Sequence, residues 1–466
     1  MVHLNENQRR LWDLAWPAIM GNISQTLLNL VDMMMVGQLG ALALAAVGLG
    51  GQVSWFMMPI MAAVATGTLA LVARFVGAKE GENATLALEQ SIYLAFLLGI
   101  PVMLFGWFLG DDILRVMGAK PDVVALGYEY IKVLFAFYPI RFAGFTAFSA
   151  LRGAGDTKTP MKLGILMNVI NAILDYLLIY GKLGFPELGA VGAAWASGIG
   201  ITTSFLIGLY LLWGGKLILR FKPSWSFHPD MAGRILRIGI PTMIERGIFS
   251  FYNFLYMSIV TRFGTVALAA HQVGLRVESI AYMPTFGFNV ATSALVGQSL
   301  GEENPEKAEK TVYEALKMVG VFMSVMAFIL IVFPRYLVMP FISPSDPDYS
   351  EVMRLASIYL IIVGISEIPL GWLFVLGGAL RGAGDTKTPM YITAVSKLLF
   401  RIVPAYLLGF GFSIPSFDVL GITFPGFTFE GLGIIAAWIA MSLETFTTAA
   451  LFWWAFKRGK WKYVKV

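Results

Sequence analysis

A run of twelve residues, ALRGAGDTKTPM, occurs twice in this chain without a change, from Ala150 to Met161 and again from Ala379 to Met390. Weaker matches, such as Pro17 with Pro241, relate the two halves at nearly the same spacing. We therefore expect two copies of one folding unit, because self-similarity at a fixed distance marks a repeated architecture. In an apolar chain, paired halves of this kind are typical of a transporter.

Composition places the repeated unit in a membrane. The chain of 466 residues is 57% hydrophobic and 14% charged, with a mean hydropathy of +0.72, which excludes a surface that faces water throughout. Roughly twelve apolar stretches, six per half, can cross about 30 Å of hydrocarbon, and each must be a helix. We predict an all-α polytopic membrane protein with spans near 14–36, 53–75, 91–110, 123–148, 160–181, 189–213, 238–260, 277–299, 313–337, 353–378, 389–412 and 432–456.

The spans divide into two pseudo-symmetric six-helix lobes. We expect an N-terminal lobe at 1–214, a linker at 215–234 and a C-terminal lobe at 235–466. The AAW of the first lobe returns at Ala436 to Trp438, later than the repeat alone requires. This shift predicts a loop about fourteen residues longer before the last span of the second lobe.

Basic residues report how the chain is oriented. They precede the first span, fill the linker, close the chain and occupy the repeated turns, and they include Arg9, Arg10, Lys216, Arg234, Lys457, Arg152 and Arg381. Cytoplasmic loops are enriched in Lys and Arg, so both termini and the linker are predicted to be cytoplasmic in a cell membrane. The net charge of +5 therefore indicates no nucleic-acid partner, because the basic residues lie at helix ends.

The repeated segment has the composition of a tight turn before a helix. Its glycines permit the turn, Thr159 or Thr388 can cap the next helix, and Pro160 or Pro389 fits the first helical position. A purely structural cytoplasmic turn is the favoured interpretation. The alternative is that the segment forms part of an inner gate.

A twelve-span chain whose halves each carry ALRGAGDTKTP after the fourth span resembles the multidrug and toxic compound extrusion (MATE) family. The single acids in VDMMMVG and LDYLLIYG, Asp32 and Asp175, are similar to those of its archaeal, DinF-like branch. The resemblance implies a V-shaped pair of lobes. It also implies export of amphipathic organic cations driven by inward H⁺ or Na⁺.

Independently of any family, polar residues line one face of the first span. Asn22, Gln25, Asn29 and Asp32 follow one another at helical spacing. A buried Asp is costly in a bilayer, by roughly 2.5 to 3.5 kcal/mol at the centre of a helix, unless it faces protein or a cavity. We therefore expect this stripe to face the protein interior.

The fifth span has a matching stripe of Asn168, Asn171 and Asp175, and Tyr130 of the fourth span is predicted at a similar depth. We expect a pocket in which Asp32, Asp175, Asn171 and Tyr130 bind H⁺ or Na⁺, with Asp32, Asn171 and Asp175 as possible Na⁺ ligands. The remaining amides, Asn22, Gln25, Asn29 and Asn168, are expected to line the cavity for the substrate. The alternative is a hydrogen-bonded network that only joins the two helices.

The second half does not repeat these acids. It carries Glu245, Glu367, Lys397 and Arg401 instead. Mutual neutralisation is the favoured interpretation, with a second cation site or a substrate contact as alternatives. Pro17 lies inside the first span and removes a backbone hydrogen bond, so it is a candidate hinge.

The sequence thus predicts a cation-coupled antiporter that exports organic cations or drugs, in contact with membrane lipids and acting as a monomer. No nucleotide-binding GxxxxGK[ST] motif is present, so we expect no ATP coupling, no cofactor beyond the coupling ion and no enzymatic activity. A flippase for a lipid-linked or polar lipid is the alternative, and it would require a strongly cationic central cleft.

Overall fold

The computed structural model describes residues 5–215, 217–224, 226–345, 347–414, 417–419, 422–424 and 427–466. Lys216, which contributed to the orientation argument, lies outside these residues. The described chain is almost entirely helical, as predicted.

The first half consists of eight helices. These are α1 (Glu6–Gly37), α2 (Ala41–Phe56), α3 (Met58–Gly77), α4 (Gly81–Val116), α5 (Pro121–Ala136), α6 (Tyr138–Gly153), α7 (Lys158–Tyr180) and α8 (Ala190–Trp213). Helices α2 and α3 are separated by Met57 alone, and α5 and α6 meet at a bend of 48°. Each pair therefore forms one broken span, which makes six spans among the described residues of this half.

The second half follows the same plan. Its helices are α9 (Pro229–Thr261), α10 (Thr265–Gly301), α11 (Pro305–Val332), the short α12 (Pro334–Val338), α13 (Tyr349–Gly382), α14 (Lys387–Ser396), α15 (Val403–Phe410) and α16 (Ile434–Lys457). A π-helical turn, η3 (Lys397–Ile402), joins α14 to α15. The three make one span, so the described residues contain the predicted twelve.

Hydropathy alone identifies fewer spans. Eight helices, or nine with the bent α5–α6 pair, are apolar enough to cross a membrane by length and composition. The long helices α1, α9 and α10 are not among them. Of these three helices, α1 carries the predicted polar stripe of Asn22, Gln25, Asn29 and Asp32, which lowers its mean hydropathy.

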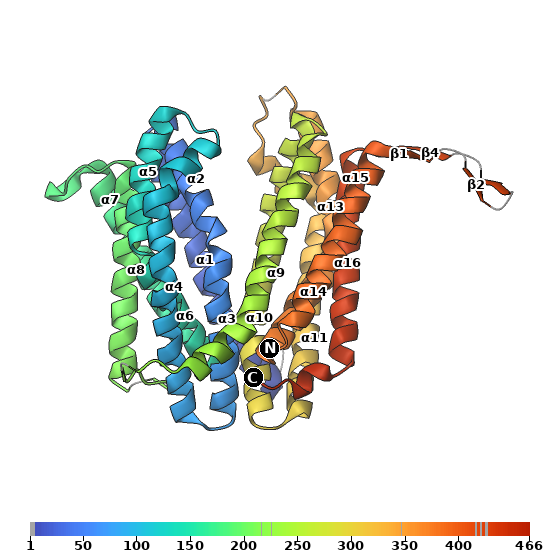
Figure 1. Cartoon of the computed structure of the whole chain (residues 1–466). Helices are drawn as coiled ribbons and strands as arrows, with labels where there is room; N and C mark the ends of the chain where they lie inside the picture. Colours follow the sequence, from blue (N-terminus) through green and yellow to red (C-terminus); the bar gives the residue numbers. More distant parts are fainter. Residues whose placement is uncertain are drawn as a thin grey trace.

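The longer loop of the second half is an extended arm. It contains β1 (Gly411–Ile414) paired antiparallel with β4 (Phe427–Glu430), and β2 (Phe417–Val419) paired with β3 (Ile422–Phe424). The arm leaves the bundle at the end far from both chain termini (Figure 1). Its position before α16 agrees with the predicted insertion.

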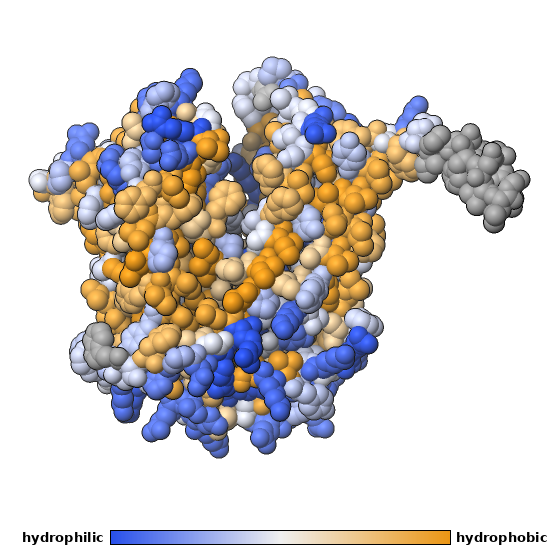
Figure 2. Space-filling model, in the orientation of Figure 1, coloured by the Kyte–Doolittle hydropathy of each residue, from blue (hydrophilic) through white to orange (hydrophobic). Residues whose placement is uncertain are grey.

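The two halves form bundles that meet at one end and separate at the other. Both termini lie at the end where the bundles meet (Figure 1). Helix crossing there is very close: a Cβ on Gly239 of α9 would lie 1.9 Å from the carbonyl oxygen of Ala63 in α3. Orange apolar side chains cover the flanks of both bundles, and blue polar side chains gather at the two ends (Figure 2). This banding fits a membrane protein.

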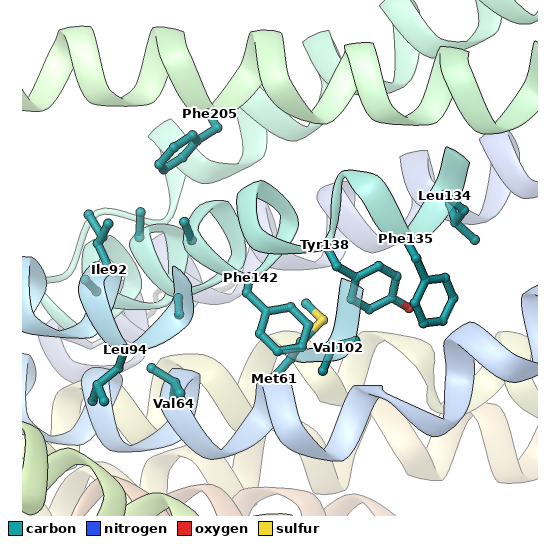
Figure 3. Packing of buried hydrophobic residues seen from close by; sticks show 14 of the residues in the cluster. Met61, Val64, Ile92, Leu94, Val102, Leu134, Phe135, Tyr138, Phe142 and Phe205 are labelled. Atoms are coloured by element: carbon teal, nitrogen blue, oxygen red, sulfur yellow. The ribbon is translucent and has the colours of Figure 1, made fainter. Parts of the chain in front are cut away.

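The core of the first half packs large side chains between α3, α4, α5 and α6. Phe135, Tyr138 and Phe142 are all buried, and the Phe135 and Tyr138 rings stack with centroids 4.4 Å apart. Figure 3 shows these rings together with Met61 and Val102. This packing holds α3, α4, α5 and α6 together as the core of the first half.

Helix α1 packs against both halves. Leu11, Leu14 and Ala15 belong to the core of the second half, whereas Val36 belongs to the core of the first. Pro17 lies between these two parts of the helix. The predicted N-terminal lobe of residues 1–214 therefore begins with a segment, Leu11 to Ala15, that packs with the second half.

The repeated turns have the predicted backbone but a different cap. Gly155 and its equivalent Gly384 adopt φ angles of +91° and +89°, which glycine accepts without strain. The cap is an aspartate rather than the predicted threonine: the backbone N–H of Thr159 donates to Oδ1 of Asp156 at 2.9 Å. The prolines are in the first turn of α7 and α14, at the third residue rather than the first.

Candidate functional site

The centre of the predicted ion site is a pair of carboxyl groups where α1 packs on α7. Asp175 is fully buried and Asp32 is half-buried, and the two carboxyl groups lie close enough to interact directly. Among the described residues, neither oxygen of Asp175 nor Oδ1 of Asp32 receives a hydrogen bond. Buried polar groups are nearly always hydrogen-bonded in native proteins, so this pair calls for a partner that the polypeptide does not supply.

Two asparagines of α7, Asn171 and Asn168, lie on the same helical face as Asp175, one and two turns before it. Nδ2 of Asn168 donates to Oγ of Ser24 at 2.9 Å, and Nδ2 of Asn171 donates to Oγ of Ser197 in α8 at 2.9 Å. Both donors are thereby used, whereas Oδ1 of each amide meets no donor among the described residues. Four side chains therefore present acceptor oxygens without matching donors. Ser24 and Ser197 were not predicted, because each lies far along the chain from the asparagine that it contacts.

Such a group of oxygens suits a hard cation or a proton. Carboxylate and amide oxygens are the ligands that alkali and alkaline-earth cations prefer, and a protonated carboxyl can donate to a neighbouring oxygen. Asp32, Asp175 and Asn171 could hold Na⁺, and either acid could hold a proton. The donor chemistry thus fits both ions named in the sequence analysis.

Tyr130 of α5 lies near this pair. Its side chain is 8% exposed, and both Asp32 and Asp175 act electrostatically on its hydroxyl. The ring rests on α2, where a Cβ on Gly50 would come within 2.6 Å of it. The structure therefore brings all four predicted ion-site residues into one region of the first half.

The amides of α1 are no more buried than Asp32. Nε2 of Gln25 donates to Oδ1 of Asn29 at 3.1 Å, and both side chains are exposed; Asn22 is half-buried. None of these three, nor Asn168, lines the large cavity between the halves. Their expected contact with substrate remains a prediction.

Charges of the second half are paired, but with other partners than expected. Arg401 donates from Nη2 to Oε2 of Glu444 at 2.6 Å, and Nζ of Lys397 lies 3.9 Å from the same oxygen. The π-helical turn η3 carries both basic residues. Glu245 instead pairs with Arg381 at 3.0 Å. The predicted neutralisation among Glu245, Glu367, Lys397 and Arg401 is therefore wrong in its partners.

Sequence reasoning missed two buried acids, Glu278 of α10 and Glu444 of α16. Glu444 is 3% exposed in the middle of the apolar α16, so it breaks the same rule that identified Asp32, namely that ionisable residues inside spans are rare. Glu367 was expected to be neutralised. It is fully buried, and among the described residues neither of its carboxyl oxygens has a hydrogen-bond partner.

A cavity of about 650 Å³ separates the two halves. Aromatic and sulfur-containing side chains from α2, α3 and α9 cover much of its wall, including Trp55, Phe56, Met58, Phe249, Phe254 and Met257. The recess between the bundles is visible at the end away from the termini (Figure 2). Its charged lining residues are Arg152, Arg246 and Arg381, of which the sequence analysis had assigned two to the cytoplasmic surface.

Comparison with known proteins gives consistent matches. The family model MatE matches residues 17–177 and 241–407, one match in each half. A probable multidrug resistance protein NorM of Thermotoga maritima is 31% identical over 463 residues, covering 98% of this chain and 94% of its own length.

Solved structures share the fold. An outward-facing multidrug resistance MATE family transporter of the MOP superfamily has a TM-score of 0.86 at 23% identity, covering 99% of this chain and 98% of its own. A MOP superfamily transporter from Pyrococcus furiosus, for which reverse polarity of the binding pocket suggests a different function, has a TM-score of 0.85 at 24% identity and covers 97% and 96%.

Proposed function

Since this chain belongs to the MatE family of membrane transporters, we propose that it is a secondary active exporter that antiports amphipathic compounds against H⁺ or Na⁺, coupled at Asp32 and Asp175. The observation that carries the proposal is the pair of adjacent carboxyl groups without hydrogen-bond donors. Two neighbouring anions in a region of low dielectric repel each other, and one bound cation or proton relieves that repulsion. Occupancy therefore alters the force between α1 and α7.

Helix α1 offers a route from ion occupancy to the second half. Its outer part carries Asp32, its inner part packs in the core of the second half, and Pro17 lies between. A proline inside a helix removes one backbone hydrogen bond and favours bending there. We propose that the charge state of the acid pair biases the bend at Pro17. The ion and the substrate then favour different states of one equilibrium.

The orientation in the membrane follows from the charge distribution. With both termini and the linker on the cytoplasmic side of a cell membrane, the end where the bundles meet faces the cytoplasm (Figure 1) and the recess opens outward (Figure 2). At the closed end, Nε2 of Gln298 in α10 donates to the carbonyl of Gly153 at 2.9 Å, which joins the halves at the first repeated turn. This contact supports the inner-gate role for the repeat. Both lobes are within one chain, so a monomer suffices.

For the cargo, family resemblance favours amphipathic organic cations, and the name of the Thermotoga maritima relative favours drugs. The aromatic lining of the cavity suits the apolar part of such molecules. One observation favours the second candidate, export of a polar lipid: the charged side chains that line the cavity are arginines. For the Pyrococcus furiosus protein, reverse polarity of the binding pocket has been taken to suggest a different function.

Reconstituted vesicles test the coupling proposal. We expect wild-type protein to drive efflux of a fluorescent amphipathic compound when a pH or Na⁺ gradient is imposed, and Asp32→Asn to abolish it. The matched control is Asp13→Asn, which makes the same chemical change at an exposed acid of α1. Normal gradient-driven efflux by Asp32→Asn would remove the proposed coupling site.

A further inference from the structure

The repeated segment delivers one arginine from each half to the interlobe cavity. Arg152 and Arg381 are the third residue of ALRGAGDTKTPM in its two copies, and both line the cavity. Each is in the last turn of its helix, α6 or α13. Arg246 of α9 adds a third guanidinium to the same wall. Each copy of the repeat therefore forms a turn and also supplies one arginine to the cavity wall.

Only one of these arginines is neutralised. Nη1 of Arg381 donates to both carboxylate oxygens of Glu245, at 3.0 and 3.2 Å. In the described chain, Arg152 and Arg246 form neither an ion pair nor a hydrogen bond with the protein, and no Asp or Glu lines the cavity. Glu245 also acts electrostatically on Arg246, so three guanidinium groups share one carboxylate and the wall carries a net positive charge.

A single substitution between the halves explains this asymmetry. At the spacing that relates Pro17 to Pro241, Glu245 corresponds to Gly21, so the first half has no carboxylate to pair with Arg152. Arg246 corresponds to Asn22. Lys397 adds to the positive field, since its ammonium lies 4.4 Å from the ring centroid of Phe249, which lines the cavity. Its own partner, Glu444, is shared with Arg401.

Two of the three guanidinium groups lie at one end of the cavity, and Arg246 lies one turn before the lining ring of Phe249 in α9. The guanidinium groups of Arg152 and Arg381 come from the ends of their helices nearest the termini, and Ser149 and Ser293 lie beside them in the lining. Trp55, Phe56 and Met257 come from parts of α2 and α9 farther from that end. A ligand that fits has an acidic head and an apolar body.

We infer that this cavity binds an amphiphile with an acidic head group, such as a phosphate, sulfate or carboxylate, and that Arg152 and Arg246 form its seat. Guanidinium groups recognise such oxyanions through paired, charge-assisted hydrogen bonds. Uncompensated arginines would repel an organic cation at the same place. The inference rests on the transporter function proposed above and names the substrate class for it.

Equilibrium binding tests the seat without any ion gradient. The full chain is placed in nanodiscs of phosphatidylcholine and titrated with two dansyl-labelled alkyl probes of equal chain length, one ending in a phosphate and one in a trimethylammonium. We expect the phosphate probe to bind at least about tenfold more tightly. Arg152→Gln and Arg246→Gln should each weaken it about tenfold, whereas Arg152→Lys should retain part of the affinity.

The control is Arg335→Gln, an exposed arginine of α12 outside the cavity, which should leave both affinities unchanged. Equal or tighter binding of the ammonium probe by wild type would overturn the inference. So would unchanged phosphate affinity in Arg152→Gln and Arg246→Gln that elute as folded monodisperse protein.

A second arm identifies the source of the acidic head group. In nanodiscs that contain phosphatidylglycerol, displacement of the probe shows that the seat accepts a lipid head group, and retention of the probe shows that it selects a free amphiphilic acid. Both outcomes support an acid seat. Because no gradient is applied, failure of this test is distinguishable from failure of ion coupling at Asp32.

Discussion

The two halves of this transporter share a backbone plan but differ in whether their central buried acids are paired with basic residues. The first half places Asp32 and Asp175 together without donors, whereas the second half surrounds Glu444 with Lys397 and Arg401. At the repeat spacings, Asp32 corresponds to Tyr256, and Asp175 to Pro404. The two halves therefore keep the same order of helices, whereas the ionisable side chains inside those helices differ.

One pair of equivalent residues, Tyr256 and Asp32, illustrates this difference between the halves. Tyr256 donates its hydroxyl to the carbonyl of Ala437 at 2.9 Å, so it is satisfied by the second half alone. Its equivalent Asp32 has an oxygen that the described protein leaves unsatisfied. An unsatisfied buried group costs free energy in the empty state, which is the expected property of a site built for a ligand.

The largest expected effect is on transport, in the first half. Asp175→Asn should abolish gradient-driven efflux, because an amide can neither exchange a proton in this range nor neutralise a cation. Glu367→Gln is the comparison in the second half, and we expect it to reduce transport less, since the acid that acts on Glu367, Glu278 of α10, already accepts a hydrogen bond from the hydroxyl of Tyr359. Vesicle efflux under separate pH and Na⁺ gradients measures both. Equal loss in the two variants would break the proposed division between the halves.

The next effect is on stability, in the second half. Glu444→Gln leaves Lys397 and Arg401 buried beside a neutral amide, and removing one partner of a buried ion pair destabilises a protein by about 3 to 5 kcal/mol. We expect a clear drop in the thermal unfolding temperature of the detergent-solubilised chain. The control is Glu351→Gln, which removes an exposed pair with Arg354 and should change little. A Glu444→Gln variant as stable as wild type would contradict the structural role.

A smaller effect is expected at the two equivalent prolines. Pro17→Ala restores a backbone hydrogen bond at the point where α1 changes its packing partner, so it should slow turnover several-fold while stability is kept or raised. Pro241→Ala should slow it less, because no acid pair lies farther along α9. Initial efflux rates at saturating gradient decide between them. Faster transport by Pro17→Ala would remove the hinge.

The smallest expected effect is on the contact between the halves at the closed end. Gln298→Leu removes the hydrogen bond to the carbonyl of Gly153 between the halves, a contact of about 0.5 to 1.5 kcal/mol. We expect greater accessibility of the inner end to a membrane-impermeant thiol reagent at a cysteine introduced near Gly155. Reduced accessibility would show that this contact does not hold the halves together.

Much of this fold could be predicted from the sequence because a bilayer admits only helices or closed barrels as spanning structures. Each predicted span overlaps a helix of the structure, and the late AAW correctly placed the extra loop before α16. The acid pair was also predictable, since the spacing of Asn168, Asn171 and Asp175 fixes one helical face. The sharing of α1 between the halves was not, because helical spacing gives the direction of a side chain but not the identity of the neighbouring helix.

The same limit explains the wrong ion pairs. Lys397 and Arg401 were expected near Glu245 and Glu367, yet their partner Glu444 lies on the next helix along the chain. Arg152 and Arg381 were placed at the surface by their position in a turn, although an arginine in the last turn of a helix can extend back along it into a cavity. Partner choice depends on interhelical geometry, which a single sequence does not contain.

Direct measurement of cation occupancy tests the central claim most sharply. Purified protein is assayed for binding of ²²Na⁺ and for proton release on Na⁺ addition, in wild type, Asp175→Asn and Glu367→Gln. The account predicts that wild type and Glu367→Gln take up a cation at the acid pair and that Asp175→Asn loses this uptake. Unchanged uptake in Asp175→Asn, with loss in Glu367→Gln, would place the coupling site in the other half and contradict the account.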